Sequence, residues 1–251
     1  MMERSVTLMV NLGVSTKSSN FAQPKRVTKM IDVSISQEIA RLCPDLQVGV
    51  IEARVVNSAT SDELWAEIEE QAGRIAQCYA LLAVNQRPAI AATRRLYKSL
   101  GKDPGRYRVA SEQLCRRIIK GLGLYRLTTL IDTVNLVSMV SGYPISGLDA
   151  DKIAGGSMEM GVGRSGESYH GIGRGELNIE GMPVYRDTQG GIATPTSDEE
   201  RTKFELNTTH VQICINAFGE EMPLGRAVDW MSSLLERYAC GTDITQRIVK
   251  P

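Results

Sequence analysis

The chain is poor in aromatic residues and has no long apolar run, and each absence excludes a class of protein. Phe, Trp and Tyr make up 5% of the 251 residues, which argues against an extended platform for stacking nucleic-acid bases. No apolar run approaches the ~20 residues that span a bilayer, so we expect no membrane partner. The N-terminus lacks the apolar core and cleavage site of a secretion signal, which favours a cytoplasmic protein.

Cysteine and histidine are also scarce. The five cysteines are odd in number and widely spaced, a pattern that favours reduced core thiols over disulfides or zinc. The two histidines, His170 and His210, stand on different segments and share no metal-ligand spacing with any cluster of Cys, Asp or Glu. We expect His170 in a loop and His210 in a structural role before a strand. The sequence therefore predicts no metal site.

The glycine-rich stretch Gly161-Val-Gly163-Arg-Ser-Gly166 matches the dinucleotide-binding fingerprint in its letters. That motif works because a helix follows the glycines and receives the pyrophosphate at its N-terminus. Here another glycine-rich turn follows, so the stretch predicts a hairpin. No serine stands in a nucleophile elbow. We expect neither a cofactor nor a catalytic triad.

A balanced total charge hides a strongly positive quarter of the chain. The 29 basic and 29 acidic residues cancel, but residues 87–126 hold eleven Lys or Arg and only two acids, Asp103 and Glu112. A single basic helix face is usually just solvated. Two adjacent basic helices and the turn between them favour contact with a polyanion, whose phosphates are bound by such charge. The candidate residues are Arg94, Arg95, Lys98, Arg106, Arg108, Arg116, Arg117 and Lys120.

Hydrophobic periodicity predicts an α+β protein in which helices pack on a mixed, largely antiparallel sheet. Strands are predicted over 5–10, 46–56 and 211–217, with a polar link over 11–29 and β-hairpins over 147–195. Helices are predicted over 36–42, after a Thr60–Glu63 capping box, over 88–100, from a Ser111 cap to Gly121, over 128–141 and over 225–239. We expect a single domain over 1–251, with an N-terminal α/β portion (1–86), a core (87–218) and a C-terminal helix (219–251).

The predicted helix over 128–141 carries a polar stripe on an otherwise apolar surface. Thr128, Asp132, Asn135 and Ser138 fall on one side at helical spacing. Buried polar groups cost about 1–3 kcal/mol each unless they find partners. These four residues either cap neighbouring loops or line a pocket, and the sequence leaves both alternatives open.

Several spaced motifs resemble a known family. Asp132, Asn135, Gly142, Pro144 and Asp149 stand at spacings similar to those of the editing domain of the bacterial phenylalanyl-tRNA synthetase beta subunit. They resemble its free-standing relatives still more. Segments 94–108, 111–121, 185–187, 201–203 and 208–209 follow the same pattern in order. The resemblance covers about residues 88–218 and implies the fold of that editing domain.

In the synthetase, this domain removes wrongly attached tyrosine from the 3′ end of tRNA. The resemblance therefore implies a stand-alone tRNA-associated protein, not a complete synthetase, with hydrolysis of misacylated aminoacyl-tRNA as its activity. Two alternatives stay open: a non-catalytic RNA- or protein-binding module that keeps the fold, and a small-molecule binding protein. We expect tRNA, and neither DNA nor a membrane, as the partner of the basic residues.

The resemblance also places the family's pocket on this sequence. Asn135 falls at a pocket position, Ser146 replaces the family's pocket histidine, and the substrate-recognising glutamate falls near Ile215 or Asn216. Segment 193–197 replaces a tryptophan-rich segment, and the family's glycine pair is kept only in part. The pocket candidates are Asp132, Asn135, Ser146, Gly190 and Gly191. Without the imidazole and the carboxylate we expect no selectivity for tyrosine, since hydroxyl recognition depends on such polar partners.

Overall fold

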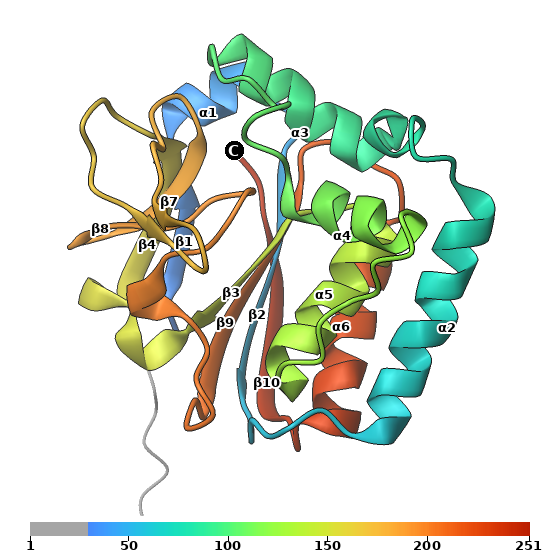
Figure 1. Cartoon of the computed structure of the whole chain (residues 1–251). Helices are drawn as coiled ribbons and strands as arrows, with labels where there is room; N and C mark the ends of the chain where they lie inside the picture. The colour runs from blue at the N-terminus through green and yellow to red at the C-terminus, as the bar shows by residue number, and fades with distance from the viewer. Residues whose placement is uncertain (1–29) are drawn as a thin grey trace, which may run out of the picture.

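A computed structural model describes residues 30–251, so the predicted strand over 5–10 and the link over 11–29 lie outside the described residues. The protein is α+β, with helices packed on mixed and antiparallel sheets (Figure 1). The central sheet is antiparallel and has the order β10-β2-β9-β3. Its strands are β2 (Gln47–Arg54), β3 (Ile145–Asp149), β9 (His210–Ala217) and β10 (Thr242–Val249).

A second four-stranded sheet has the order β1-β4-β7-β8. Its β1 runs parallel to β4, and the remaining pairs are antiparallel. The strands are β1 (Asp32–Ile35), β4 (Ser157–Val162), β7 (Pro183–Asp187) and β8 (Gly190–Ala193). A short hairpin pairs β5 (His170–Gly171) with β6 (Gly175–Glu176).

Six α-helices accompany these sheets in the described part of the chain. Figure 1 shows α5 and α6 against one side of the central sheet, with the second sheet on the other side. None of the helices within residues 30–251 has the length and apolarity that crossing a membrane requires. The helices are α1 (Gln37–Leu42), α2 (Asp62–Cys78), α3 (Pro88–Ser99), α4 (Ala110–Ile119), α5 (Thr129–Ser141) and α6 (Leu224–Tyr238).

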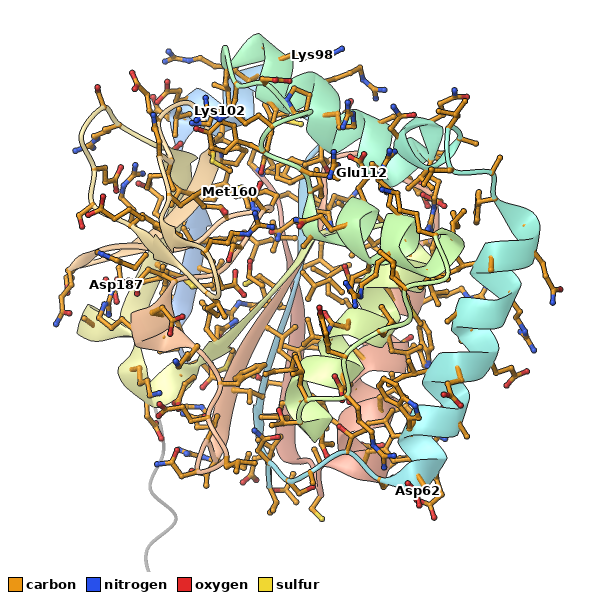
Figure 2. All side chains as sticks on the ribbon, in the orientation of Figure 1. Asp62, Lys98, Lys102, Glu112, Met160 and Asp187 are labelled. Carbon is orange, nitrogen blue, oxygen red and sulfur yellow. The ribbon has the colours of Figure 1, made fainter. Side chains whose placement is uncertain are left out.

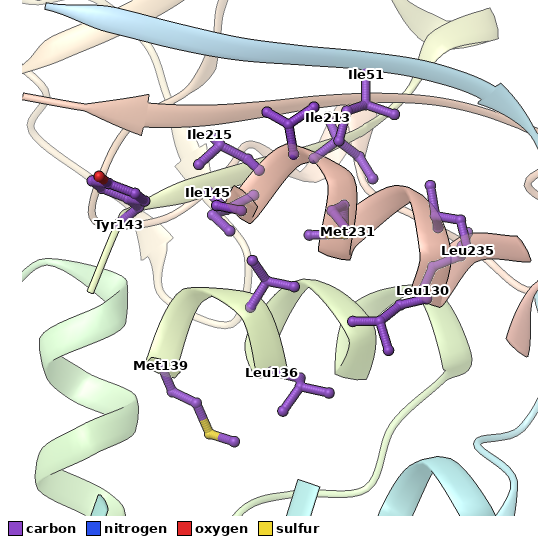
Figure 3. Close-up of a cluster of buried hydrophobic side chains, with 14 of the residues drawn as sticks. Ile51, Leu130, Leu136, Met139, Tyr143, Ile145, Ile213, Ile215, Met231 and Leu235 are labelled. Atoms are coloured by element: carbon purple, nitrogen blue, oxygen red, sulfur yellow. The ribbon is translucent and has the colours of Figure 1, made fainter. Parts of the chain in front are cut away.

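Both faces of the central sheet are buried. On the helix side, Ile51, Ile213 and Ile215 pack in one cluster with Leu136 of α5 and Met231 of α6 (Figure 3). On the other side, residues such as Val48 and Cys214 join a cluster with Met160 and Tyr185 of the second sheet. Every residue of β9 is therefore buried, including the polar residues that alternate with its isoleucines.

The predicted helices form, but two of the predicted caps are wrong. Ser61, and not Thr60, caps α2, where its Oγ accepts a hydrogen bond from Leu64 N at 3.3 Å. The Thr60 hydroxyl instead donates to Asp132. Ser111 lies inside the first turn of α4, and its Oγ donates to the Gly142 carbonyl at 2.8 Å. In both cases a partner distant in sequence captures the side chain that the local pattern assigned to a cap.

Three strands were not predicted, and the glycine-rich stretch forms no nucleotide loop. β1 spans only four residues, every residue of β3 is buried, and β10, at the sheet edge, has no buried residue. Gly161 belongs to β4, and no helix follows Gly163. A Cβ at Gly163 would lie 1.8 Å from the Ile179 carbonyl oxygen, so this glycine serves close backbone packing.

Candidate functional site

Much of the positive charge of residues 87–126 is used inside the protein. Glu112 of α4, whose side chain is 2% exposed, gathers three arginines around its carboxylate. Arg94 Nη1 lies 2.8 Å from Glu112 Oε2, while Arg108 Nε and Arg116 Nη1 lie 3.5 and 3.8 Å from Oε1. These three candidates for phosphate binding therefore hold α3, α4 and the turn between them together.

Other basic residues of this segment are also occupied. Arg87 is buried, pairs with Glu221 at 2.8 Å and donates to the Met139 and Val140 carbonyls. Lys102 is buried and donates to the Asn178 carbonyl at 2.7 Å. Arg126 donates to the Thr60 carbonyl and pairs with Asp62. The segment's charge is thus largely structural.

Four of the candidate residues remain exposed on the surface. Figure 2 labels Lys98 at the outer edge of the molecule, on α3. The exposed candidates are Arg95, Lys98, Arg106 and Lys120. Arg117 is half-buried and lies against Tyr125. A polyanion that contacts this surface would meet these residues before the three arginines at Glu112.

The polar residues of the α5 stripe do not share one role: some hydrogen-bond to neighbouring loops, and one lines a pocket. Asp132 Oδ2 accepts hydrogen bonds from Leu127 N at 2.9 Å and from the Thr60 hydroxyl, so it closes the loop before α5. Ser138 Oγ donates to the Tyr143 carbonyl at 2.8 Å and closes the loop after α5. The Thr128 hydroxyl is buried without a hydrogen-bond partner among the described residues. Asn135 lines a cavity.

This cavity, which we call the Asp198 cavity, has a volume of about 230 Å³. It lies between α5, β3 and the segment that follows β8. An apolar pocket with a few convergent polar groups is the usual form of a small-ligand site. Its apolar walls are Ala110, Leu127, Ile131, Val134, Ile145, Gly147, Ile172 and Phe204, and its polar residues are Asn135, Thr194, Ser197, Asp198 and Lys203.

Asp198 is the acidic side chain on the cavity wall. Its Oδ2 accepts a hydrogen bond from Gly147 N at 3.0 Å, and the Ser146 side chain also hydrogen-bonds to the carboxylate. Burial raises the pKa of Asp198 to about 7, although both hydrogen bonds act to lower it. A carboxyl group that titrates near neutral pH in a cavity is suited to take up and release a proton.

The segment Thr194–Asp198 is held firmly in place around this carboxylate. Ala110 N at the start of α4 donates to the Pro195 carbonyl at 2.9 Å, and Tyr97 and Thr196 share a hydrogen bond of 2.9 Å between their hydroxyls. The Tyr169 hydroxyl donates to the Ser197 carbonyl at 2.7 Å. These contacts come from elements that are distant in sequence, so no local motif identifies Asp198 as a site residue.

Gly147 shapes the cavity as well as holding Asp198. A Cβ at this position would lie 2.6 Å from Phe204 Cε2 and 3.3 Å from Val134 Cγ2. Both neighbours are cavity residues. Any larger residue in the middle of β3 would therefore push the cavity walls apart or fill the space beside Asp198.

The structure brings together only some of the pocket candidates. Asn135 lies on the cavity, whereas Ser146 does not, although both were expected to open onto it. Successive side chains of a strand point to opposite faces, so Ser146 faces away between Ile145 and Gly147, and it reaches the site through Asp198. Gly190 and Gly191 pair with β7 in the second sheet, away from the cavity lining.

Asp132 and the family's glutamate position also lie outside this lining. Asp132 borders a smaller neighbouring cavity that also contacts Asn135. Ile215 is buried in the cluster between the central sheet and the helices. The Asn216 amide is buried on the other face, where Oδ1 accepts from the Tyr185 hydroxyl at 2.7 Å. Neither residue lines the Asp198 cavity.

The two histidines have different surroundings. His210 is buried, with Nε2 2.9 Å from Glu52 Oε1 and Nδ1 2.9 Å from Asp151 Oδ1. The hydrogen bond with Glu52 is the main cause that raises the pKa of His210. His170 is exposed in the short β5 strand. Within residues 30–251, no group of three or more His, Cys, Asp or Glu is arranged to hold a metal ion.

Comparisons with known proteins identify a domain family. A model of the B3/4 domain matches residues 92–246. No protein with a curated description matches the chain. An N-terminal fragment of the phenylalanyl-tRNA synthetase beta subunit from Pyrococcus horikoshii matches with a TM-score of 0.44 and 14% identity. That match covers 90% of this chain and 53% of the fragment, so the chain spans about half of the fragment's length. Because the domain model covers more than half of the residues, the chain belongs to the B3/4 domain family.

Proposed function

We propose that this protein binds the aminoacyl end of a misacylated tRNA and hydrolyses its ester bond. The observation that carries the proposal is the Asp198 cavity, an apolar pocket with a carboxyl group of near-neutral pKa on its wall. Membership of the B3/4 family supports the choice of an aminoacyl-tRNA as substrate. The apolar lining favours aminoacyl groups with small or apolar side chains.

The chemistry of ester hydrolysis fits these groups. The ionised Asp198 carboxylate takes a proton from a water molecule, and the water oxygen attacks the ester carbonyl carbon. The bond between that carbon and the ribose oxygen then breaks, and Asp198 returns the proton to the ribose oxygen. Positioning a water and holding the substrate contribute as much to such a reaction as a protein nucleophile does. Asn135, which also lines the cavity, supplies an amide for the developing oxyanion.

A deacylation assay with a panel of misacylated tRNAs tests the proposal. The wild type should release the amino acid, and Asp198→Asn should lower kcat by about 10²-fold or more, the range for a lost general base. Asp229→Asn, at an exposed position on α6, is the matched control and should leave the rate unchanged. Equal rates for the wild type and Asp198→Asn would contradict the assignment of Asp198.

Selectivity is tested in the same assay. We predict that the protein does not prefer Tyr-tRNA over Phe-tRNA, because the family's glutamate position does not face the Asp198 cavity and most of the lining is apolar. Apolar pockets discriminate between substrates far less than sites that hydrogen-bond a hydroxyl. Robust tyrosine-selective hydrolysis by the wild type would overturn this prediction.

A second candidate function is non-catalytic binding of a small molecule in the Asp198 cavity. It is favoured by one observation: Arg94, Arg108 and Arg116 are bound to Glu112 inside the protein, which leaves fewer cations for a polyanion. Under this candidate, free apolar amino acids would bind in the cavity while tRNA would not bind at low salt. Calorimetric titration with each distinguishes the two functions.

A further inference from the structure

A groove lies between α2 and the end of α4, and Figure 1 shows α2 at the outer edge of the molecule. We call it the α2 groove; it has a volume of about 480 Å³. One wall is formed by α2 between Trp65 and Ala76, and the other by the end of α4 and the residues that follow it, Gly121, Gly123 and Leu124. The groove shares no residue with the lining of the Asp198 cavity, so it is a separate surface.

The segment that follows α4 exposes apolar side chains beside this groove. Leu122, Tyr125 and Leu127 are 59%, 65% and 51% exposed. In the part of the chain that the structure describes, ten large hydrophobic side chains are exposed, and three of them fall within these six residues. Single exposed apolar residues are ordinary, but a cluster of them is typical of a surface that a partner covers. Leu122 stands between two glycines of the groove wall, so the cluster and the groove form one surface.

The two walls of the α2 groove carry opposite charge. Residues 62–70 of α2 contain five acids and no base, whereas residues 116–126 contain four bases and no acid. Some of these charges are paired within the chain, as Arg126 is with Asp62. Glu69 on one wall and Lys120 beside the other are both exposed. A surface with an acidic half and a basic half is complementary to a second copy of itself.

We propose that the α2 groove is the contact surface of a homodimer with two-fold symmetry. A two-fold axis along the groove places the acidic α2 of each copy opposite the basic segment after α4 of the other. The same rotation turns Leu122 and Tyr125 of each copy toward the groove of its partner, so both apolar clusters become buried. A second copy therefore supplies the complementary charge and the apolar side chains together.

Sedimentation equilibrium of the full chain tests the dimer. At low salt, the apparent mass should rise with protein concentration from that of one chain to that of two. Added salt should weaken the Kd of dimerisation, because opposite charges supply part of the attraction. Leu122→Asp should weaken this Kd about tenfold or more, since it places a charge in a buried apolar contact and opposite the acidic α2. Glu69→Lys should also weaken it, because it places a base opposite the basic segment.

The matched control is Leu42→Asp, the same change at another exposed leucine. Leu42 ends α1 and is 43% exposed, and Figure 1 shows α1 apart from α2. This variant should dimerise with the Kd of the wild type. Both leucines are exposed, so both variants should keep the far-UV circular dichroism spectrum of the folded protein.

Hydrogen exchange locates the contact within the chain. The backbone amides of residues 65–76 and 118–125 should become better protected as the protein concentration rises, and should not do so in Leu122→Asp. A monomer at every concentration would overturn the proposal, and so would a dimer that Leu122→Asp leaves intact. Protection of the groove in a monomer, lost when residues 1–29 are removed, would also overturn it and identify the chain's own N-terminal segment as the occupant.

Discussion

At the scale of single residues, ionisation of the Asp198 carboxyl lowers the stability of the folded protein. Burial raises the pKa of this carboxyl to about 7 in the folded protein, whereas an aspartate in an unfolded chain titrates near ~3.9. Between these pH values the unfolded chain binds fewer protons than the folded protein. The free energy of unfolding therefore falls as the pH rises through this window. The folded state carries this cost in order to keep a carboxyl group in an apolar cavity.

The first prediction follows from this cost. Asp198→Asn should raise the Tm above that of the wild type at pH 8, because the amide avoids burying a negative charge and its oxygen still accepts from Gly147 N. Near pH 4, where the wild-type carboxyl is protonated, the difference should vanish. Thermal unfolding at the two pH values checks this, and a variant that is less stable than the wild type at pH 8 would contradict it.

Ser146 offers a second test at the same site. Its hydrogen bond lowers the pKa of Asp198, so Ser146→Ala should shift that pKa upward. The pH dependence of kcat/KM should move to higher pH, and a ¹³C NMR titration of the Asp198 carboxyl should move with it. A purely structural role for Ser146 would change stability but leave both titration curves in place.

For His210, we predict a contribution to stability that is lost as the pH rises. Hydrogen bonds with Glu52 and Asp151 raise the pKa of His210. Its contribution is fully present below the unfolded value of ~6.5 and is lost as the pH rises through the folded pKa. His210→Gln should therefore cost more stability at pH 6 than at pH 9. Urea unfolding at both pH values measures the two differences, and a constant difference would argue against a charged His210.

At the scale of elements, the buried carboxylate of Glu112 stabilises the packing of α4 against its neighbours. Removing the Glu112 charge leaves Arg94, Arg108 and Arg116 close together without their shared partner. Breaking a buried ion pair on one side typically costs about 3–5 kcal/mol. We predict that Glu112→Gln destabilises the protein by an amount of this order in urea unfolding. Glu70→Gln, in the exposed Glu70–Arg74 pair, is the control and should cost less than about 1 kcal/mol.

The helices could be predicted from local sequence signals, whereas the roles of several polar residues could not. The helices were predictable because periodicity, Pro88 and the glycines after α3 and α5 are local signals. Thr60 and Asn135 are both polar residues beside apolar ones, yet Thr60 binds Asp132 and Asn135 lines the cavity. Asp198 carries no pattern at all, because the partners of its carboxylate, Ser146 and Gly147 of β3, are distant in sequence. The surroundings of such residues are determined by contacts with partners that are distant in sequence.

For the whole molecule, we predict that the exposed basic residues contribute to tRNA binding. Replacing Arg95, Lys98, Arg106 and Lys120 with Gln should weaken tRNA binding and flatten its salt dependence, since each lost phosphate contact releases fewer counterions. A control variant with Arg41, Arg74, Arg226 and Lys250 replaced, all exposed, should bind normally. Binding assays across a salt series measure both. If the wild type binds no tRNA at low salt, the nucleic-acid interpretation is wrong.

Arg94 and Arg116 are left unchanged in this variant, although the sequence made them candidates for tRNA binding. Reversing them to Glu would place new negative charge next to Glu112 and confuse loss of binding with loss of folding. The division of the chain into portions 1–86, 87–218 and 219–251 within one domain stays a prediction.

The position of β2 in the central sheet has a consequence for synthesis on the ribosome. β2 (Gln47–Arg54) pairs on one side with β9 (His210–Ala217) and on the other with β10 (Thr242–Val249). Its partners therefore emerge only after nearly all of the described chain has been translated. Pairing between such distant segments is slow, and an unpaired apolar strand is prone to aggregate meanwhile. We expect the nascent chain to depend on chaperones until β9 and β10 are released.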